Sequence, residues 1–251
     1  MDVVFAVVTA VVASAFAVEL LISWRGRRRL HAEVWSMAFG AYALGAWALV
    51  AGLSLGWTSL SFRSFYFFGA IANIPLLAAG SIALVVSERA ARRFLTPTML
   101  WVVLGFFATF LAPFVGELPT DGIPDGSEVF GFTFAIEALT LPGPRLFAAV
   151  SGAVGSVVII GLSLVSVVRF IRRNRRLAMA NVLIITGVIV PALGGTLTAL
   201  GESAALSLSL MVGISLLWLG YRMAVSARET PATDDSTVWE IRVRSLEEKP
   251  R

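Results

Sequence analysis

Long apolar runs alternate with short polar segments along this chain, and the lengths of the runs indicate its elements. A transmembrane helix needs about 20 mainly apolar residues, because each residue advances 1.5 Å and the hydrocarbon layer is about 30 Å thick. Seven runs meet this requirement, at residues 3–24, 34–55, 65–87, 98–116, 146–168, 177–200 and 203–225. The pattern therefore predicts an all-α membrane protein, folded as a bundle of seven transmembrane helices.

Individual residues mark two of the helix boundaries. Only Gly201 and Glu202 separate the sixth run from the seventh, and a glycine allows the chain to turn there. Thr96 and Pro97 are typical of an N-cap followed by proline at the first helical position. They predict that the fourth helix begins at this point.

Arginines gather in alternate connections between the predicted helices. Fourteen lie at or just after the ends of the first, third, fifth and seventh runs: Arg25, Arg27, Arg28, Arg29, Arg89, Arg92, Arg93, Arg169, Arg172, Arg173, Arg175, Arg176, Arg222 and Arg228. The other connections hold only Arg63 and Arg145. Because positive loops stay on the cytoplasmic side, this bias predicts an external N-terminus and a cytoplasmic C-terminus. The arginine clusters need no nucleic acid to explain them, and we expect them to contact anionic lipid headgroups.

The composition agrees with a membrane protein. The chain is 57% hydrophobic with a mean hydropathy of +0.84, against about 45–50% apolar residues in a soluble domain. Lys249 is the only lysine, and the preference for arginine points to a GC-rich bacterial genome. We therefore expect a multi-pass protein of a bacterial cytoplasmic (inner) membrane.

Few groups in the sequence could support catalysis. The chain has no cysteine, which excludes disulfides and thiolate metal sites. His31 is the only histidine and lies in the first basic connection, so a Ser-His pair within the bilayer lacks one partner. No pair of carboxylates suited to magnesium and diphosphate lies in the runs or at their cytoplasmic ends. We expect a protein that is not an enzyme and that holds no cofactor or metal.

The connection at residues 117–144 is long, external and acidic. Its alternating Phe130, Phe132, Phe134 and Ile136 predict a short strand or a flap over the helix ends. Its acidic residues Asp121, Asp125 and Glu128 could instead form a cation site, although their spacing departs from the EF-hand loop. Residues 229–251 are polar and predict a cytoplasmic tail.

The first three and last three helices of the seven-helix domain, residues 1–228, follow a similar order of features. Arg25 and Arg169 each close a helix before a basic connection, and Gly40 corresponds to Gly187. The segment LLAAGS at residues 76–81 aligns with LLWLGY at residues 216–221. These matches predict parallel repeats at about residues 1–93 and 145–228, related by an axis along the membrane normal and joined by the linker helix 98–116. The alternative is coincidence between periodic apolar sequences.

Three resemblances follow from these features. FYFFGAIANIPLLAAGSIAL, residues 65–84, resembles a segment of uncharacterised seven-helix integral membrane proteins of high-GC bacteria. The 3+1+3 plan resembles SWEET and PQ-loop sugar transporters, whose paired Pro-Gln signature is missing here. Microbial rhodopsins share the helix number and external N-terminus, and hold retinal through a lysine in the last helix. The seventh run has no lysine, which excludes a retinal Schiff base.

Five residues within the runs are candidates for ligand binding. Glu19 is an acid inside a predicted span, where ionisable groups are costly, so it either faces the interior as a proton or cation acceptor or reaches toward the headgroups. Asn73 precedes Pro75 near the middle of the third run, and Thr186 precedes Pro191 in the sixth. Proline frees a backbone carbonyl that could line a site, and the alternative is interhelical hydrogen bonding with a packing kink.

These observations predict an integral membrane protein that binds or transports a small molecule or lipid at the interface of the repeats. The competing interpretation is an accessory or sensory subunit that binds another membrane protein. A carrier needs a polar, accessible cavity between the halves, whereas an accessory subunit needs a dry interior and an exposed face of small or aromatic residues.

Overall fold

The computed structural model describes residues 1–119, 122–199 and 203–229, and it confirms the all-α architecture. Seven helical spans are long and apolar enough to cross a membrane. The third span is divided into α3, a π-helical segment η1 and α4. The spans are α1 (Asp2–Arg27), α2 (Leu30–Leu55), α3 (Ser59–Tyr66) with η1 (Phe67–Ala72) and α4 (Asn73–Val85), α5 (Glu88–Leu111), α7 (Pro144–Phe170), α8 (Arg175–Ala199) and α9 (Ser203–Glu229).

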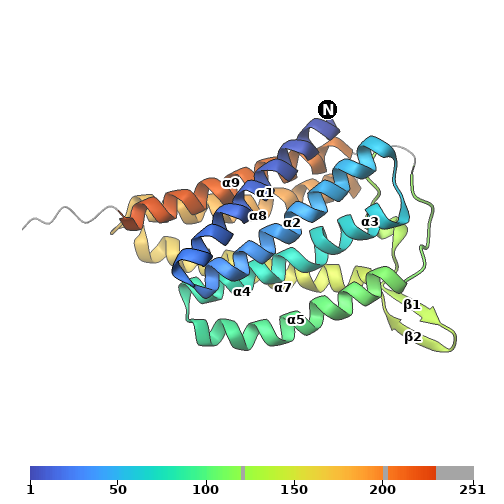
Figure 1. Cartoon of the computed structure of the whole chain (residues 1–251), viewed down its shortest axis with the longest axis horizontal. Coiled ribbons are helices and arrows are strands. Elements are labelled where there is room, and N and C mark those ends of the chain that lie inside the picture. Colours follow the sequence, from blue (N-terminus) through green and yellow to red (C-terminus); the bar gives the residue numbers. More distant parts are fainter. Residues whose placement is uncertain (120–121, 200–202, 230–251) are drawn as a thin grey trace, which may run out of the picture.

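Six of these spans form a closed ring, and α5 lies outside it (Figure 1). Around the ring, α1 packs on α2, α2 on α4, α4 on α7, α7 on α8, α8 on α9, and α9 returns to α1. The helix α5 packs on α4 and α7. A two-fold axis through the centre of the ring would relate the contact between α4 and α7 to the contact between α9 and α1. The parallel repeat itself stays a prediction.

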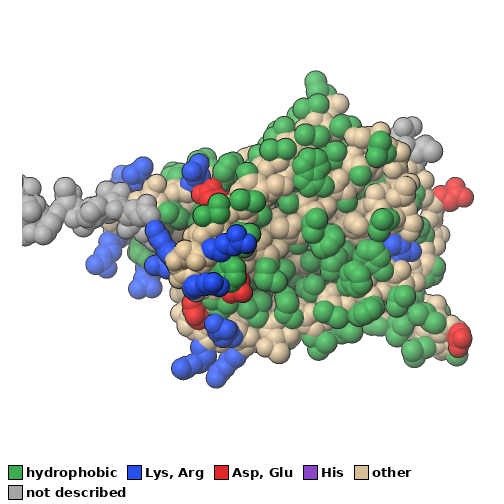
Figure 2. Space-filling view, in the orientation of Figure 1, with side chains coloured by type: hydrophobic (Ala, Val, Ile, Leu, Met, Phe, Trp, Pro, Cys, Tyr) green, Lys and Arg blue, Asp and Glu red, His purple; other side chains and the backbone are tan. Residues whose placement is uncertain are grey.

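The two ends of the ring differ in charge (Figure 2). We call one the arginine end, where the turns from α1 to α2, from α4 to α5 and from α7 to α8 lie with the end of α9. We call the other the hairpin end, where α1 begins and the chain between α5 and α7 forms a β-hairpin. Apolar side chains cover the flank between them in Figure 2, as a surface facing lipid requires. Which end faces the cytoplasm stays a prediction.

The fourth span begins at Glu88, well before the predicted start. The expectation that Pro97 opens this helix is wrong, because Pro97 lies inside α5. The hydroxyl of Ser87 caps the helix by accepting the N–H of Ala90 at 3.1 Å. The sequence pattern missed this start because the first two turns of α5 carry arginines, and the apolar run begins only after them. The helix ends at Leu111 instead of residue 116.

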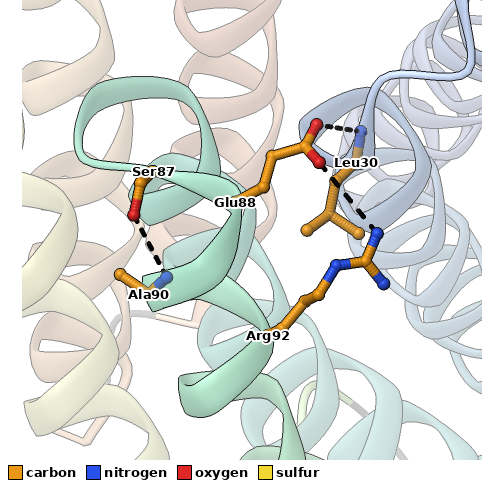
Figure 3. A network of polar contacts seen from close by, with 5 residues as sticks. All are labelled: Leu30, Ser87, Glu88, Ala90 and Arg92. Atoms are coloured by element: carbon orange, nitrogen blue, oxygen red, sulfur yellow. Dashed lines mark hydrogen bonds and ion pairs between the residues drawn. The ribbon is translucent and has the colours of Figure 1, made fainter.

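The same turn joins α5 to the start of α2 (Figure 3). The carboxylate of Glu88 accepts the backbone N–H of Leu30 at 3.4 Å and lies 4.0 Å from the guanidinium of Arg92. A carboxylate at a helix N-terminus is favourable because it satisfies an amide without a helical partner and interacts with the helix dipole. This contact holds α5 beside the ring at the arginine end.

The third span contains a wide turn directly before its proline. Its N-terminus is fixed by a capping box between Thr58 and Ser61. Pro75 has no N–H and would clash with the carbonyl four residues earlier, that of Ile71, in a regular α-helix. Ile71 belongs to η1, whose π-helical turn widens the backbone at this point. The sequence suggested a kink at Pro75, and the structure places a π-helix there.

The chain between α5 and α7 contains a short helix, α6 (Gly126–Val129), and two strands, β1 (Thr133–Ile136) and β2 (Leu139–Pro142). The strands pair antiparallel, with Ile136 opposite Leu139. This hairpin confirms the strand predicted from the alternating apolar residues. Phe130 is buried instead against the ring of Phe62, at a centroid distance of 5.6 Å. Asp121 and the tail from residue 230 lie outside the described residues.

Candidate functional site

A cavity of about 430 Å³ lies within the ring at the hairpin end. We call it the hairpin-end cavity. Every ring helix except α1 contributes to its walls, with the chain around Asp125 at its mouth. The walls include Tyr42, Gly45 and Ala46 of α2, Tyr66 of α3, Gly69 of η1, Ile74 of α4, Ala148, Gly152 and Ser156 of α7, Pro191 and Gly195 of α8, and Leu206 and Leu210 of α9.

The cavity exists because small residues line it at positions where helices do not touch. A Cβ atom on Gly152 or Gly195 would meet nothing within 4 Å. One turn further along α7 the situation is reversed, since a Cβ on Gly155 would lie 2.5 Å from the Cγ2 of Ile74. Gly155 thus allows α7 to approach α4, whereas Gly152 leaves open space inside the ring.

The mouth of the cavity is covered by the chain at residues 122–126. The indole N–H of Trp57 donates to the carbonyl of Gly122 at 2.8 Å, and Gly126 packs against the ring of Tyr66. Asp125 accepts the N–H and the hydroxyl of Ser127, each at 2.8 Å, and so caps α6. Among the described residues no group of three potential metal ligands is found, so the suggested cation site with Glu128 has no support there.

A smaller extension of about 90 Å³ leads deeper into the ring. It shares Tyr42, Ile74 and Pro191 with the hairpin-end cavity, so the two spaces are adjacent. Asn73 lines the extension, is only 7% exposed, and its Oδ1 is buried without a hydrogen-bond partner. Burying an unpaired carbonyl oxygen costs about 1–3 kcal/mol, so this atom is an acceptor suited to a ligand.

Two of the predicted residues thus meet in one site, and two others do not. Asn73 and Pro191 line the cavity and its extension. Pro75 is buried within α4, one residue beyond the cavity wall at Ile74. Thr186 lies on the exposed face of α8 and donates its hydroxyl to the carbonyl of Val182 at 3.0 Å. The helical period decides this difference, because Thr186 and Pro191 are five residues apart and so point in different directions.

Glu19 lies at the opposite end of the ring. It lines a second space of about 470 Å³, the arginine-end pocket, together with Arg27, Arg29 and His31. Its carboxylate accepts the indole N–H of Trp218 at 2.7 Å and lies 3.6 Å from the Nε of Arg222. With a side chain 35% exposed, Glu19 combines both predicted environments: it faces a pocket and is paired with an arginine.

Tyrosines are the residues that sequence reasoning missed. The chain has three, and all line internal spaces: Tyr42 and Tyr66 the hairpin-end cavity, and Tyr221 the arginine-end pocket. A polar aromatic residue inside an apolar run was the available signal, because a buried hydroxyl needs a partner. Tyr42 finds one in the carbonyl of Leu210, at 3.1 Å.

Comparison with models of protein families, with curated proteins and with solved structures found no match to this chain.

Proposed function

We propose that this membrane protein binds a small, largely apolar molecule in the hairpin-end cavity. The volume of about 430 Å³ is within the range of about 300–1,000 Å³ found for ligand sites. Such sites are mainly apolar and carry a few polar groups that orient the ligand. The observation that carries the proposal is Asn73, which lines the extension and whose buried Oδ1 has no hydrogen-bond partner among the described residues.

The walls indicate the chemical class of the ligand. No lysine or arginine lines the cavity in the part of the chain that the structure describes. Asp125, at the mouth, already accepts two hydrogen bonds from Ser127. The ligand is therefore uncharged, and a hydroxyl or amide donor on it pairs with Asn73. A lipid fragment and a free metabolite could both present this chemistry.

The hollow ring favours ligand binding over the accessory-subunit interpretation. An accessory subunit requires a dry, filled interior, because its binding surface is on the outside. Here Gly152 and Gly195 leave space inside the ring where larger apolar residues could have filled it. We further propose, from the arginine bias, that the hairpin end faces outward and that the protein resides in a bacterial inner membrane.

Native mass spectrometry of the detergent-purified protein tests this proposal. Gly152→Leu fills the cavity, and Gly161→Leu is the matched control, because Gly161 lies on the exposed face of the same helix and a Cβ there also meets nothing. We expect the wild type and Gly161→Leu to retain a discrete small molecule and Gly152→Leu to lose it. Equal spectra for all three proteins would contradict the proposal, and a stoichiometric second protein in place of a small molecule would favour an accessory subunit.

A further inference from the structure

The hairpin-end cavity and the arginine-end pocket are separated by only a thin layer of side chains. Between them lies a gap of about 20 Å³. Its walls include Phe39 and Leu77, which also line the extension below the cavity, and Trp35 and Tyr221, which also line the arginine-end pocket. The spaces thus form one series along the ring. The gap has room for about one water molecule, so the series is closed at this level.

Aromatic rings from three helices form this closure, and we call Phe16, Trp35, Phe39 and Tyr221 the aromatic layer. The centroid of the Phe16 ring lies 4.1 Å from that of Phe39 and 5.2 Å from that of Tyr221. The rings of Trp35 and Tyr221 are 6.0 Å apart, nearly edge to face. Such contacts are individually weak, about 0.5–1.5 kcal/mol beyond the area they bury, so rotation of a few side chains can break them.

One hydrogen bond fixes the layer to the facing helix. The indole N–H of Trp35, on α2, donates to the carbonyl of Leu77, on α4, at 3.1 Å. Gly80 leaves room for this indole, because a Cβ at that position would overlap the Trp35 ring. The carbonyl of Leu77 also accepts the hydroxyl of Ser81 at 2.8 Å, so it keeps a partner when the indole leaves. The layer can therefore open without leaving that carbonyl unpaired.

We propose that the ring is a translocation path. The ligand of the hairpin-end cavity passes to the arginine-end pocket when the aromatic layer opens, and this inference rests on the proposed binding function. The structure represents the state in which the layer is closed. In the second state Trp35 releases Leu77, the extension beside Asn73 joins the arginine-end pocket, and the cavity becomes accessible from the arginine side.

Cysteine accessibility tests the path, since the chain has no cysteine of its own. Ser156→Cys places a thiol in the hairpin-end cavity. A charged, membrane-impermeant methanethiosulfonate is added to one side at a time of sealed vesicles containing the full chain. Ala138→Cys, in the hairpin turn, and Gly26→Cys, at the end of α1, report which side is exposed. Ser215→Cys, on the exposed face of α9, reports reaction from the lipid phase.

We expect the thiol at position 156 to react from both sides, while the two reference thiols react from one side each and the thiol at position 215 from neither. Trp35→Phe keeps a ring but removes the donor to Leu77, so it should speed the reaction from the arginine side about fivefold, the shift that loss of one hydrogen bond gives. Trp47→Phe is the matched control, because Trp47 lies on the same helix, faces outward and donates to Ser14.

Reaction of the thiol at position 156 from the hairpin side alone, in an otherwise wild-type chain, would overturn the path. Reaction from neither side would do the same. The wild-type measurement decides the question even if Trp35→Phe does not fold. These outcomes differ from failure of the binding proposal, because a closed path leaves the molecule retained in mass spectrometry unchanged, whereas the absence of that molecule overturns binding itself.

Discussion

The hairpin-end cavity and the arginine-end pocket have similar volumes within one ring but opposite chemistry. Glycines, alanines and tyrosines line the first, and Asn73 Oδ1 in its extension has no partner. The second contains Glu19, Arg27, Arg29 and His31. The carboxylate of Glu19 is paired with both the indole of Trp218 and the guanidinium of Arg222.

The difference shows how one ring of helices can contain two spaces of opposite chemistry. At the hairpin end, space arises because small side chains leave the helices without contact, and the extension of that space has one buried acceptor without a partner, Asn73 Oδ1. At the arginine end, space is bordered by charged groups that are partly exposed, and water weakens the ion pairs between them. We expect substitutions to have large effects at the first end and small ones at the second.

The largest effect is expected from Gly155→Leu, which breaks the wall of the hairpin-end cavity. The new side chain has no room beside Ile74, so α7 must move away from α4. Overpacking of this kind costs about 3 kcal/mol or more when backbone is involved. Unfolding in a graded series of SDS concentrations measures the loss. Gly152→Ala, where a Cβ meets no atom, should match the wild type, and equal stability of both variants would contradict this account of the wall.

Arg63→Met should loosen α5 at the hairpin end. The guanidinium donates to the carbonyls of Thr109 and Ala112 at the C-terminal end of α5 and lies 4.4 Å from the centroid of the Phe114 ring. Hydrogen bonds from a charged donor contribute about 2 kcal/mol, so a loss of that size is expected in the same unfolding assay. Arg145→Met is the control, since Arg145 lies near the same end over the ring of Phe132. An effect of Arg63→Met no larger than that of the control would exclude this role.

Asn73→Leu separates binding from stability, because the two should change in opposite directions. Leucine has the same branched shape as asparagine and removes the unpaired Oδ1, so we expect a gain of about 1 kcal/mol in the free energy of unfolding. The retained ligand should be lost at the same time. Asn181→Leu provides the comparison at the arginine end, where the amide already donates to the carbonyl of Leu177 at 2.8 Å and no gain is expected. A destabilised Asn73→Leu would instead assign Asn73 a structural role.

The smallest effect is expected from Glu19→Gln at the arginine end. Glutamine can still accept the indole N–H of Trp218. The ion pair with Arg222 that is lost is partly exposed to solvent, so the free energy of unfolding should change by less than about 1 kcal/mol. Ligand retention at the hairpin end should be unchanged. Loss of the retained molecule in this variant would show that the two spaces are coupled through the aromatic layer in the closed state.

Sequence patterns predicted the fold better than they predicted the candidate site. The number of spans follows from apolar runs, and one strand of the hairpin follows from alternating apolar residues, because both signals are local. The start of α5 was missed since its first turns carry Arg89, Arg92 and Arg93 outside the apolar run. For the site, Asn73 and Pro191 were found because polar residues and prolines are unusual in a span, but the same argument also selected Thr186, which faces outward.

The glycines show why the rest could not be predicted. Gly152 and Gly155 lie one turn apart on α7 in equally apolar surroundings, yet one opens a cavity and the other closes a helix contact. Sequence spacing places both on one side of the helix but does not say how far away the neighbouring helix is. Likewise, Trp35 and Trp47 lie on α2, and only the ring determines that the first belongs to the aromatic layer while the second faces outward.

The sequence by itself determined that this chain forms seven apolar helices with its arginines in alternate connections, since helix length and the cost of burying charge depend on the local composition of each segment. Only the tertiary structure decided that six helices form a ring with α5 outside, that a cavity remains at the hairpin end, and that Asn73 lines its extension while Glu19 lies in a separate pocket. These features depend on the distances between helices, which are set by side chains far apart in the sequence packing against one another.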